Sequence, residues 1–292
     1  MTHSDSRPDK RILAVHDLSG FGHTSLMAIM PIMYRMGLQT AVLPSALLSA
    51  NTDFPGFRMV DFGDSMMDFI GHWKKLGLRF DAIYTGFLGN PAQAEMLVSA
   101  FGDLVAKDGI ILVDPVLGDA GKLYSCYDES MIDAMKMLVK YADIISPNVF
   151  EAAMLVGADP NASIDSEACG CWAKQLCMDR TKHCIITSVP SADPRYTHVG
   201  HYDREMDVYC EYSCEYVPVW FPGTGDCFSA FLIAGIMNGF PIGISIQATM
   251  VLLRDAIRLS IPLVKDPRTG IALQRVMDLD IMGYFTGVSS GR

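Results

Sequence analysis

Short apolar runs with strand character alternate along this chain with longer runs of helical spacing, and this alternation limits the possible folds more than any other feature. Strands that alternate with helices form a mostly parallel sheet covered on both faces, so the predicted fold class is α/β. Strands are predicted at 11–15, 39–43, 82–85, 109–113, 143–146 and 183–187. Helices are predicted at 25–36, 64–76, 92–106, 131–141, 148–156, 166–179 and 228–237.

Two later runs depart from the alternation and indicate an antiparallel edge. The segments 197–202 and 206–212 both have strand character and are separated only by a turn predicted at Asp203-Arg204. The chain contains no internal repeat, low-complexity tract or linker-like stretch. We therefore expect one domain over residues 11–292, preceded by a polar, flexible tail at 1–10.

Charge and composition exclude several classes of function. The net charge is −10 and Lys/Arg residues do not cluster, which argues against a nucleic-acid partner. No run is apolar enough to span a bilayer and none reads as a signal peptide, so a cytoplasmic protein without a membrane partner is expected. The eight cysteines lack the paired spacing of a zinc site and are expected to be reduced.

The loop Pro222-Gly223-Thr224-Gly225-Asp226 opens the apolar run 227–237. Its two glycines allow backbone amides to approach a ligand closely, and the start of a helix favours a phosphate group. Asp226 lies in the first helical turn, where the helix dipole keeps a carboxylate ionised. Such a carboxylate can take a proton from an alcohol, as a kinase requires. The alternative is that Asp226 only caps a core helix.

Polar residues also follow three predicted strands. Asp114 and Asp119 lie on one loop, which suits magnesium or a monovalent cation. Asn148 and Glu151 lie at a helix start after Ser146-Pro147, and Thr187-Ser188 ends a further strand. Each has a structural alternative, since Asp-Pro turns are common and Asn148 could simply cap its helix. Together, at one edge of one sheet, they favour a kinase site.

Two common cofactor motifs are not satisfied. The segment 16–25 approaches the dinucleotide fingerprint, but Ser25 replaces the third glycine and Pro44-Ser45 stands where a ribose-binding carboxylate is expected. The segment 118–123 has the wrong spacing for a Walker loop.

The order of these strand-end motifs resembles the ribokinase-like superfamily and, within it, the pyridoxal/pyridoxamine kinases. The superfamily resemblance is carried by 114–119, 142–151 and 223–226, and the narrower one by 45–52 and 85–89. It implies a three-layer α/β/α sandwich whose mostly parallel central sheet has an antiparallel edge. It also implies an ATP-dependent kinase that phosphorylates the 5′-hydroxymethyl group of pyridoxal, pyridoxamine or pyridoxine in vitamin B6 salvage to pyridoxal 5′-phosphate. Mg²⁺, K⁺ or Na⁺, and a homodimer are implied in the same way.

The resemblance assigns a role to each motif. Asp226 would be the general base, and the anion hole for the migrating phosphoryl group would be Gly223, Thr224 and Gly225. The residues near ATP and magnesium would be Asp114, Asn148, Glu151, Thr187 and Ser188. The metal-ion ligands would come from Asp114, Ser146, Glu151 and Thr187. The vitamer would be bound by Asp17, Ser19, Thr52, Phe87 and Asp226.

The sequence departs from the family pattern at Asp17, where many vitamin B6 kinases carry serine near the pyridine nitrogen. A carboxylate there leads to the hypothesis that pyridoxamine is preferred. The stretch 17–22 is also similar to the corresponding turn of hydroxymethylpyrimidine kinases, so that activity is the alternative on the same fold. A non-catalytic binder of vitamers or nucleotides, and a nicotinamide-dependent reductase, are two further alternatives.

Overall fold

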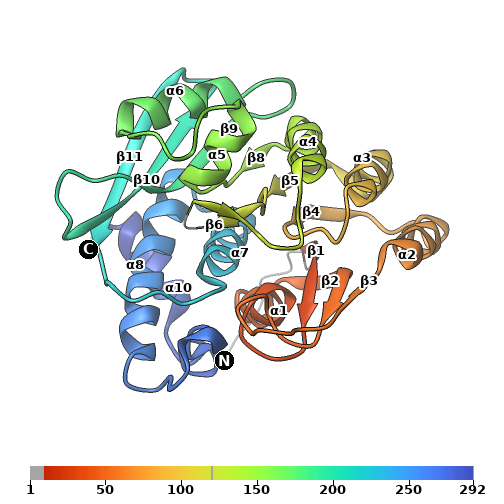
Figure 1. Ribbon diagram of the computed structural model, residues 1–292, viewed down its shortest axis with the longest axis horizontal. Helices are drawn as coiled ribbons and strands as arrows, with labels where there is room; N and C mark the ends of the chain where they lie inside the picture. Colours follow the sequence, from red (N-terminus) through yellow and green to blue (C-terminus); the bar gives the residue numbers. More distant parts are fainter. Residues whose placement is uncertain (1–9, 120, 292) are drawn as a thin grey trace.

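A nine-stranded sheet forms the centre of the computed structural model, which describes residues 10–119 and 121–291. The strand order is β11-β10-β9-β8-β5-β4-β1-β2-β3, as Figure 1 shows. Its members are β1 Arg11–Ser19, β2 Gln39–Leu48, β3 Met59–Asp61, β4 Phe80–Thr85, β5 Val105–Val113, β8 Ile144–Ile145, β9 His183–Val189, β10 Tyr196–Asp203 and β11 Val208–Glu215. A two-stranded ribbon pairs β6 Gly118–Asp119 with β7 Lys122–Leu123.

The ladders confirm the mostly parallel sheet and its antiparallel edge. The strands β2, β1, β4, β5, β8 and β9 are joined by parallel pairings. At one edge β10 and β11 run antiparallel, and their turn lies at 204–207 rather than at the predicted Asp203-Arg204. The opposite edge is antiparallel as well, because β3 folds back on β2 with Leu48 opposite Met59. This second edge was not predicted, since three residues carry too little pattern to identify a strand.

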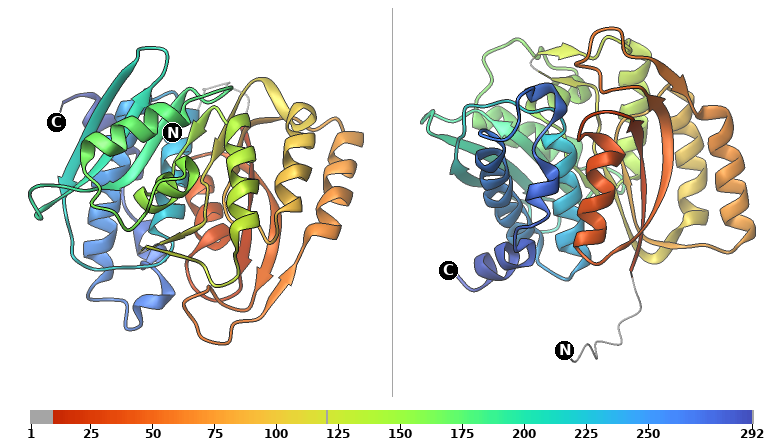
Figure 2. Two further views of the ribbon diagram at one scale, coloured as in Figure 1. Left: turned by 45° about the horizontal axis from the view of Figure 1, so that its top comes forward. Right: turned by 90° about the horizontal axis from the view of Figure 1, so that it is seen from below.

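Two layers of helices cover the sheet, as Figure 2 shows from two directions. One face packs against α1 Ser25–Arg35, α7 Thr224–Met237, α8 Ile242–Ser260 and α10 Ile281–Ser289. The other packs against α2 Gly63–Lys75, α3 Ala92–Leu104, α4 Glu129–Leu138, α5 Val149–Val156 and α6 Ser166–Leu176. Short helical turns complete the chain: η1 Val139–Tyr141, η2 Pro267–Thr269 and α9 Leu273–Val276.

The two-residue period of β1 explains why both faces are covered. Ile12 and Ala14 belong to the hydrophobic core under α1 and α7, whereas Leu13 and Val15 belong to the core on the other face. All four side chains are fully buried. A strand that is apolar on both faces needs cover on both, which is the reason for a three-layer arrangement.

The central strands β1 and β2 are longer than predicted. β1 continues to Ser19 rather than ending at 15, and β2 continues to Leu48 rather than 43. Their ladder passes a register shift between His16 and Leu18 and then resumes. Polar residues of 16–19 that were predicted in a turn are therefore held on a strand.

Other helix and strand ends differ from the predictions by a few residues; the largest shifts move the start of β5 from 109 to Val105 and the start of α7 from 228 to Thr224. The predicted tail at 1–10 lies, except for Lys10, outside the described residues. In the ranges 10–119 and 121–291, none of the helices has the length and apolar character needed to cross a membrane.

Candidate active site

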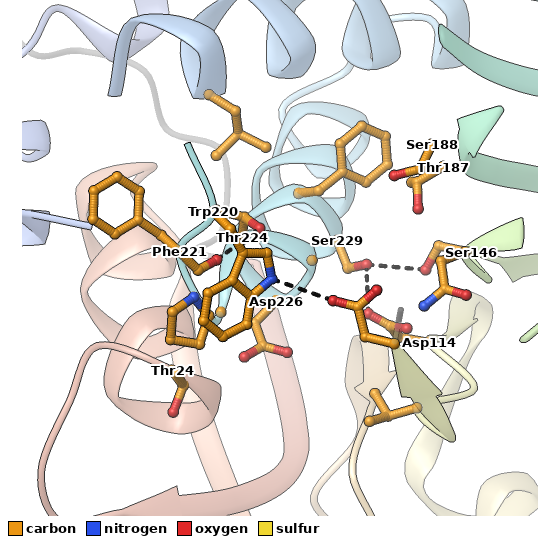
Figure 3. A pocket seen from close by; sticks show the side chains of 18 of the residues that line it. Thr24, Asp114, Ser146, Thr187, Ser188, Trp220, Phe221, Thr224, Asp226 and Ser229 are labelled. Atoms are coloured by element: carbon orange, nitrogen blue, oxygen red, sulfur yellow. Dashed lines mark hydrogen bonds between the residues drawn. The ribbon is translucent and has the colours of Figure 1, made fainter. Parts of the chain in front are cut away.

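A cavity of about 590 Å³ opens at the carboxyl ends of the parallel strands, where α7 begins. Figure 3 shows several of its side chains, which come from the ends of β5, β8 and β9 and from the start of α7. The chain brings every site residue predicted from the sequence into this one cavity: Asp17, Ser19, Thr52, Phe87, Asp114, Ser146, Asn148, Glu151, Thr187, Ser188, Gly223, Thr224, Gly225 and Asp226.

Gly223 lies just before α7 and Gly225 lies in its first turn, and only one of the two positions requires glycine. Gly223 has φ +79°, and a Cβ there would lie 2.7 Å from the His23 carbonyl oxygen, so this position requires glycine. A Cβ on Gly225 would meet nothing within 4 Å. The first α-helical hydrogen bond runs from the Cys227 amide to the Gly223 carbonyl, so the amides before it face the cavity end of the helix without helical acceptors. This is the geometry of an anion seat.

Asp226 is held at the entrance to α7 by two groups. Its Oδ2 accepts a hydrogen bond of 2.7 Å from the Ser25 amide, and its Oδ1 lies 3.2 Å from His16 Nε2. Burial alone would raise the pKa of Asp226, but the charge of His16, contact with it and the Ser25 amide lower the pKa below its ordinary value. Asp226 is therefore ionised at neutral pH, as a proton acceptor must be.

Reasoning from the sequence did not identify His16 as a site residue. Its imidazole is 2% exposed, and Nδ1 lies 2.9 Å from Asp17 Oδ1. Burial disfavours the charged ring, yet Asp226 and Asp17 outweigh it and raise the pKa of His16 to about 10. The cavity wall thus holds the His16 ring between two carboxylates, 2.9 Å and 3.2 Å from its two nitrogens.

The other residues predicted to bind the vitamer line the same cavity. Asp17 is buried, and its second oxygen accepts a hydrogen bond of 2.9 Å from Ser19 Oγ. The Phe87 ring is stacked on Tyr127 with centroids 5.1 Å apart, which fixes an aromatic wall. Thr52 is half-buried in the loop after β2.

Asp114 is joined to a hydroxyl chain that reaches across the cavity floor, as Figure 3 shows. Ser229 Oγ donates to Asp114 Oδ2 at 2.9 Å and lies 3.0 Å from Ser146 Oγ. Burial and the charge of Asp226 raise the pKa of Asp114 to about 7. Ser229 was not predicted, although its position three residues after Asp226 places it on the same helix face.

Asn148 and Glu151 form a reciprocal cap at the start of α5. Asn148 Oδ1 accepts the Glu151 amide and Glu151 Oε2 accepts the Asn148 amide, both at 2.8 Å. Both residues therefore cap the helix, as the structural alternative predicted, and both also line the cavity. Glu151 Oε1 also accepts the Leu117 amide, and burial with the charge of Asp114 raises the pKa of Glu151 well above its ordinary value.

Thr187 and Ser188 occupy the end of β9 beside this cap. Asn148 and Thr187 form an isolated parallel bridge that continues the sheet beyond β8. Ser188 has φ +59°, an uncommon backbone conformation for a residue with a side chain. Such local strain is often found at ligand sites.

Part of the cavity lining is apolar and was not predicted. This apolar compartment consists of Val199, Phe228, Met250, Leu253 and Ile257, which lie on β10, α7 and α8 and belong to one hydrophobic cluster or pack against it. Trp220, on the segment before α7, also lines the cavity, and its indole N–H donates a hydrogen bond of 3.3 Å to Asp119. An apolar slot next to an anion seat can hold a planar base attached to phosphates.

Carboxyl and hydroxyl oxygens at the floor fit magnesium. Asp114 and Glu151 are buried, with burial raising the pKa of both, and a divalent cation would offset the cost of ionising them. Over the described ranges, no three His, Cys, Asp or Glu side chains gather into a ready metal centre. Two carboxylates with substrate phosphates are a usual way to bind Mg²⁺. All eight cysteines are free thiols.

Comparison with known proteins finds a matching family model and similar solved structures. A family model described as phosphomethylpyrimidine kinase matches residues 75–268. A Bacteroides thetaiotaomicron protein named as a phosphomethylpyrimidine kinase and crystallised with pyridoxal is 38% identical, with a TM-score of 0.89 over 93% of this chain and 95% of its own. Pyridoxal kinase from Lactobacillus plantarum is 28% identical, with a TM-score of 0.84 over 93% and 98%.

A curated pyridoxine/pyridoxal/pyridoxamine kinase of Bordetella bronchiseptica is 27% identical over 251 residues. The match covers 79% of this chain and 82% of the Bordetella protein.

Proposed function

Because the chain belongs to the phosphomethylpyrimidine kinase family and resembles the pyridoxal kinases of the ribokinase-like superfamily, we propose that it is a vitamin B6 kinase. It transfers the γ-phosphoryl group of ATP to the 5′-hydroxymethyl group of pyridoxal, pyridoxamine or pyridoxine. The observation that carries the proposal is the position of ionised Asp226 beside an open anion seat, in a cavity that has both a polar and an apolar compartment.

The roles follow from this arrangement. Asp226 accepts the proton of the substrate hydroxyl, while the amides at Gly223, Thr224 and Gly225 stabilise the negative charge of the phosphoryl group in flight. Phosphoryl transfer depends mainly on positioning and charge stabilisation, which these groups supply. We call the part of the lining formed by His16, Asp17, Phe87 and Asp226 the polar compartment, and the vitamer ring binds there.

The floor of the cavity holds the nucleotide phosphates. Asp114 and Glu151 hold magnesium, which neutralises phosphate charge when bound, and Asn148 and Ser188 lie near the phosphates. Ser146 and Thr187, with Asp114, form the site for K⁺ or Na⁺. The adenine base enters the apolar compartment between β10 and α8.

A panel of substrates tests the proposal. The purified protein, ATP and Mg²⁺ are mixed with each B6 vitamer in turn, and ADP release and the 5′-phosphate product are measured. Vitamer-dependent ADP release supports the proposal; vitamer binding without ADP release indicates a non-catalytic binder and overturns it. A reductase would change nicotinamide absorbance and release no ADP.

Hydroxymethylpyrimidine kinase activity is the second candidate. It is favoured by the description of the matching family model and by the Asp17-Leu18-Ser19-Gly20 stretch. Including hydroxymethylpyrimidine in the same panel separates the two candidates by kcat/KM.

The remaining assignments complete the proposal. We propose a single kinase domain over 11–292, a homodimer and a cytoplasmic location. The continuous sheet from β1 to β11 supports one domain, and the family resemblance supports the dimer. Light scattering after size-exclusion chromatography measures the mass of the assembly against the 32.0 kDa of one chain.

A further inference from the structure

His16 connects two carboxylates across the polar compartment. Its Nδ1 lies 2.9 Å from Asp17 Oδ1, and its Nε2 lies 3.2 Å from Asp226 Oδ1. Nδ1 also lies 3.0 Å from the Asp17 backbone nitrogen, so a protonated ring donates to the carboxylate whereas a neutral ring can accept from the amide. The ring is 2% exposed, so water does not screen either contact. Nε2 has no aligned hydrogen bond in the structure, so its contact with Asp226 acts through charge when the ring is protonated, and it can tighten when a ligand binds.

The backbone makes room for this ring. A Cβ on Gly86 would lie 2.1 Å from His16 Cδ2 and 2.2 Å from its Nε2, which no side chain tolerates. Gly86 follows the last residue of β4, and its amide bonds to the Val15 carbonyl at 2.9 Å. The imidazole therefore lies directly against the Gly86 backbone. Tyr84 contacts the ring from the side, with centroids 6.3 Å apart.

We propose that His16 is a positioning residue for the reaction, acting through Asp226. Asp17 holds the ring by Nδ1, the Gly86 backbone fixes its plane, and Nε2 presents a positive charge to the Asp226 carboxylate. This inference rests on the proposed function, because it assigns the control of the general base in that reaction.

The arrangement serves the base in two ways. An opposite charge within about 4–6 Å lowers a carboxyl pKa by about 1–3 units, which keeps buried Asp226 ionised in the presence of Asp114 and the incoming phosphates. The imidazolium also offsets one of the negative charges that meet in this cavity. Without it, burial would favour the protonated, inactive form of Asp226.

The pH profile of His16→Gln tests the inference, because glutamine keeps polarity without charge. We expect the acid limb of kcat/KM to move to higher pH by about 1–3 units, since Asp226 then protonates more easily. The groups that face His16 are Asp17 on its own strand, Tyr84 on β4, Asp226 on α7 and, at longer range, Asp114 after β5. Because Asp114 has a pKa near 7, profiles are measured at saturating Mg²⁺ in both proteins.

Three further variants separate positioning from stability. Gly86→Ala keeps every charge but displaces the ring, so its acid limb should move in the same direction. Gly102→Ala on α3 is the glycine control, because a Cβ there meets nothing within 4 Å. His201→Gln is the histidine control: this ring is also buried, on β10 outside the cavity, and its loss should lower Tm without moving the acid limb.

The charge of the ring is also measured without turnover. Nitrogen-15 NMR of the histidines, with His16 assigned by its absence in His16→Gln, should show both ring nitrogens protonated at pH 8. A neutral His16 at pH 8, or an unmoved acid limb in folded His16→Gln, overturns the inference. Failure of the wild-type protein to release ADP with any vitamer overturns the proposed function instead, and the NMR result still decides the charge of His16.

Discussion

The Ser25 backbone amide donates a hydrogen bond of 2.7 Å to the Asp226 carboxylate, which ties the first residue of α1 to the first turn of α7. Ser25 has φ +53°, so the chain adopts an uncommon backbone conformation where this bond is made. Two helix starts thus face the same carboxylate, and both favour its negative charge. The position of Asp226 is therefore set by segments 201 residues apart in the sequence.

Replacing Asp226 by asparagine should abolish most turnover while leaving the fold and ligand binding intact. Asparagine retains an oxygen for the Ser25 amide but cannot accept the substrate proton. We expect kcat to fall by about 10²–10⁴-fold. Steady-state kinetics give kcat, and calorimetry with pyridoxal and with ATP gives the two affinities. The exposed Asp108→Asn variant serves as control, and near-normal turnover of Asp226→Asn would remove the residue from the mechanism.

The two glycines before and within the first turn of α7 should respond differently to alanine. Gly223→Ala places a Cβ 2.7 Å from the His23 carbonyl at a positive φ, so Tm should fall clearly. Gly225→Ala meets no protein atom within 4 Å, so Tm should stay near that of the wild type. Its methyl group would instead crowd the anion seat, and kcat should fall at least about tenfold. Equal losses of Tm in both variants would contradict this difference.

The sequence predicted the positions of the parallel strands well, because the strands and helices of this fold have distinct periods of apolar residues. The sequence could not predict β3, because these three residues form a strand only through their pairing with Ala46, Leu47 and Leu48 of β2. The sequence also predicted that β1 ends at Val15, because the polar residues His16 and Asp17 interrupt the apolar run. Tertiary contacts keep these polar residues on a buried strand, and no local pattern reports such contacts.

The same limit applies to the candidate site. Asp226, Asp114 and Glu151 were predicted because strand ends and helix starts have recognisable sequence signals. His16 was missed because its importance comes from Asp226, which is 210 residues away in the sequence and 3.2 Å away in space. The apolar compartment was missed for a related reason. Its residues, such as Leu253, lie on core-facing helix positions that look the same as ordinary core in the sequence.

Replacing Asp17 by serine tests what this carboxylate does. The sequence led to the hypothesis that it favours pyridoxamine, but both of its oxygens are engaged, by His16 and by Ser19. We therefore expect kcat to fall by a similar factor for all three vitamers, because His16 loses the group that orients it. Steady-state kinetics with each vitamer measure this factor. A loss confined to pyridoxamine would support direct contact between Asp17 and the substrate amine.

Asp114 links the acidity of the cavity to the stability of the metal-free protein. Its folded-state pKa of about 7 lies above the ordinary value of 3.8, because of burial and the charge of Asp226. The folded protein then binds this proton more tightly than the unfolded chain does. Without magnesium, the contribution of Asp114 to the free energy of unfolding should therefore decrease as pH rises from about 4 to about 7.

Asp114→Asn should remove this decrease, because asparagine keeps the size and the contact with Ser229 but does not ionise. At pH 8 without magnesium we expect the variant to be more stable than the wild type by at least about 1 kcal/mol, and at pH 4 to match it. His16, whose raised pKa of about 10 makes stability fall above pH 6.5, acts in both proteins. Urea unfolding across this pH range measures the difference in free energy of unfolding between the two proteins. A difference that does not change with pH would contradict a buried, ionising Asp114. Because the variant lacks a magnesium ligand, Mg²⁺ with ATP should stabilise only the wild type.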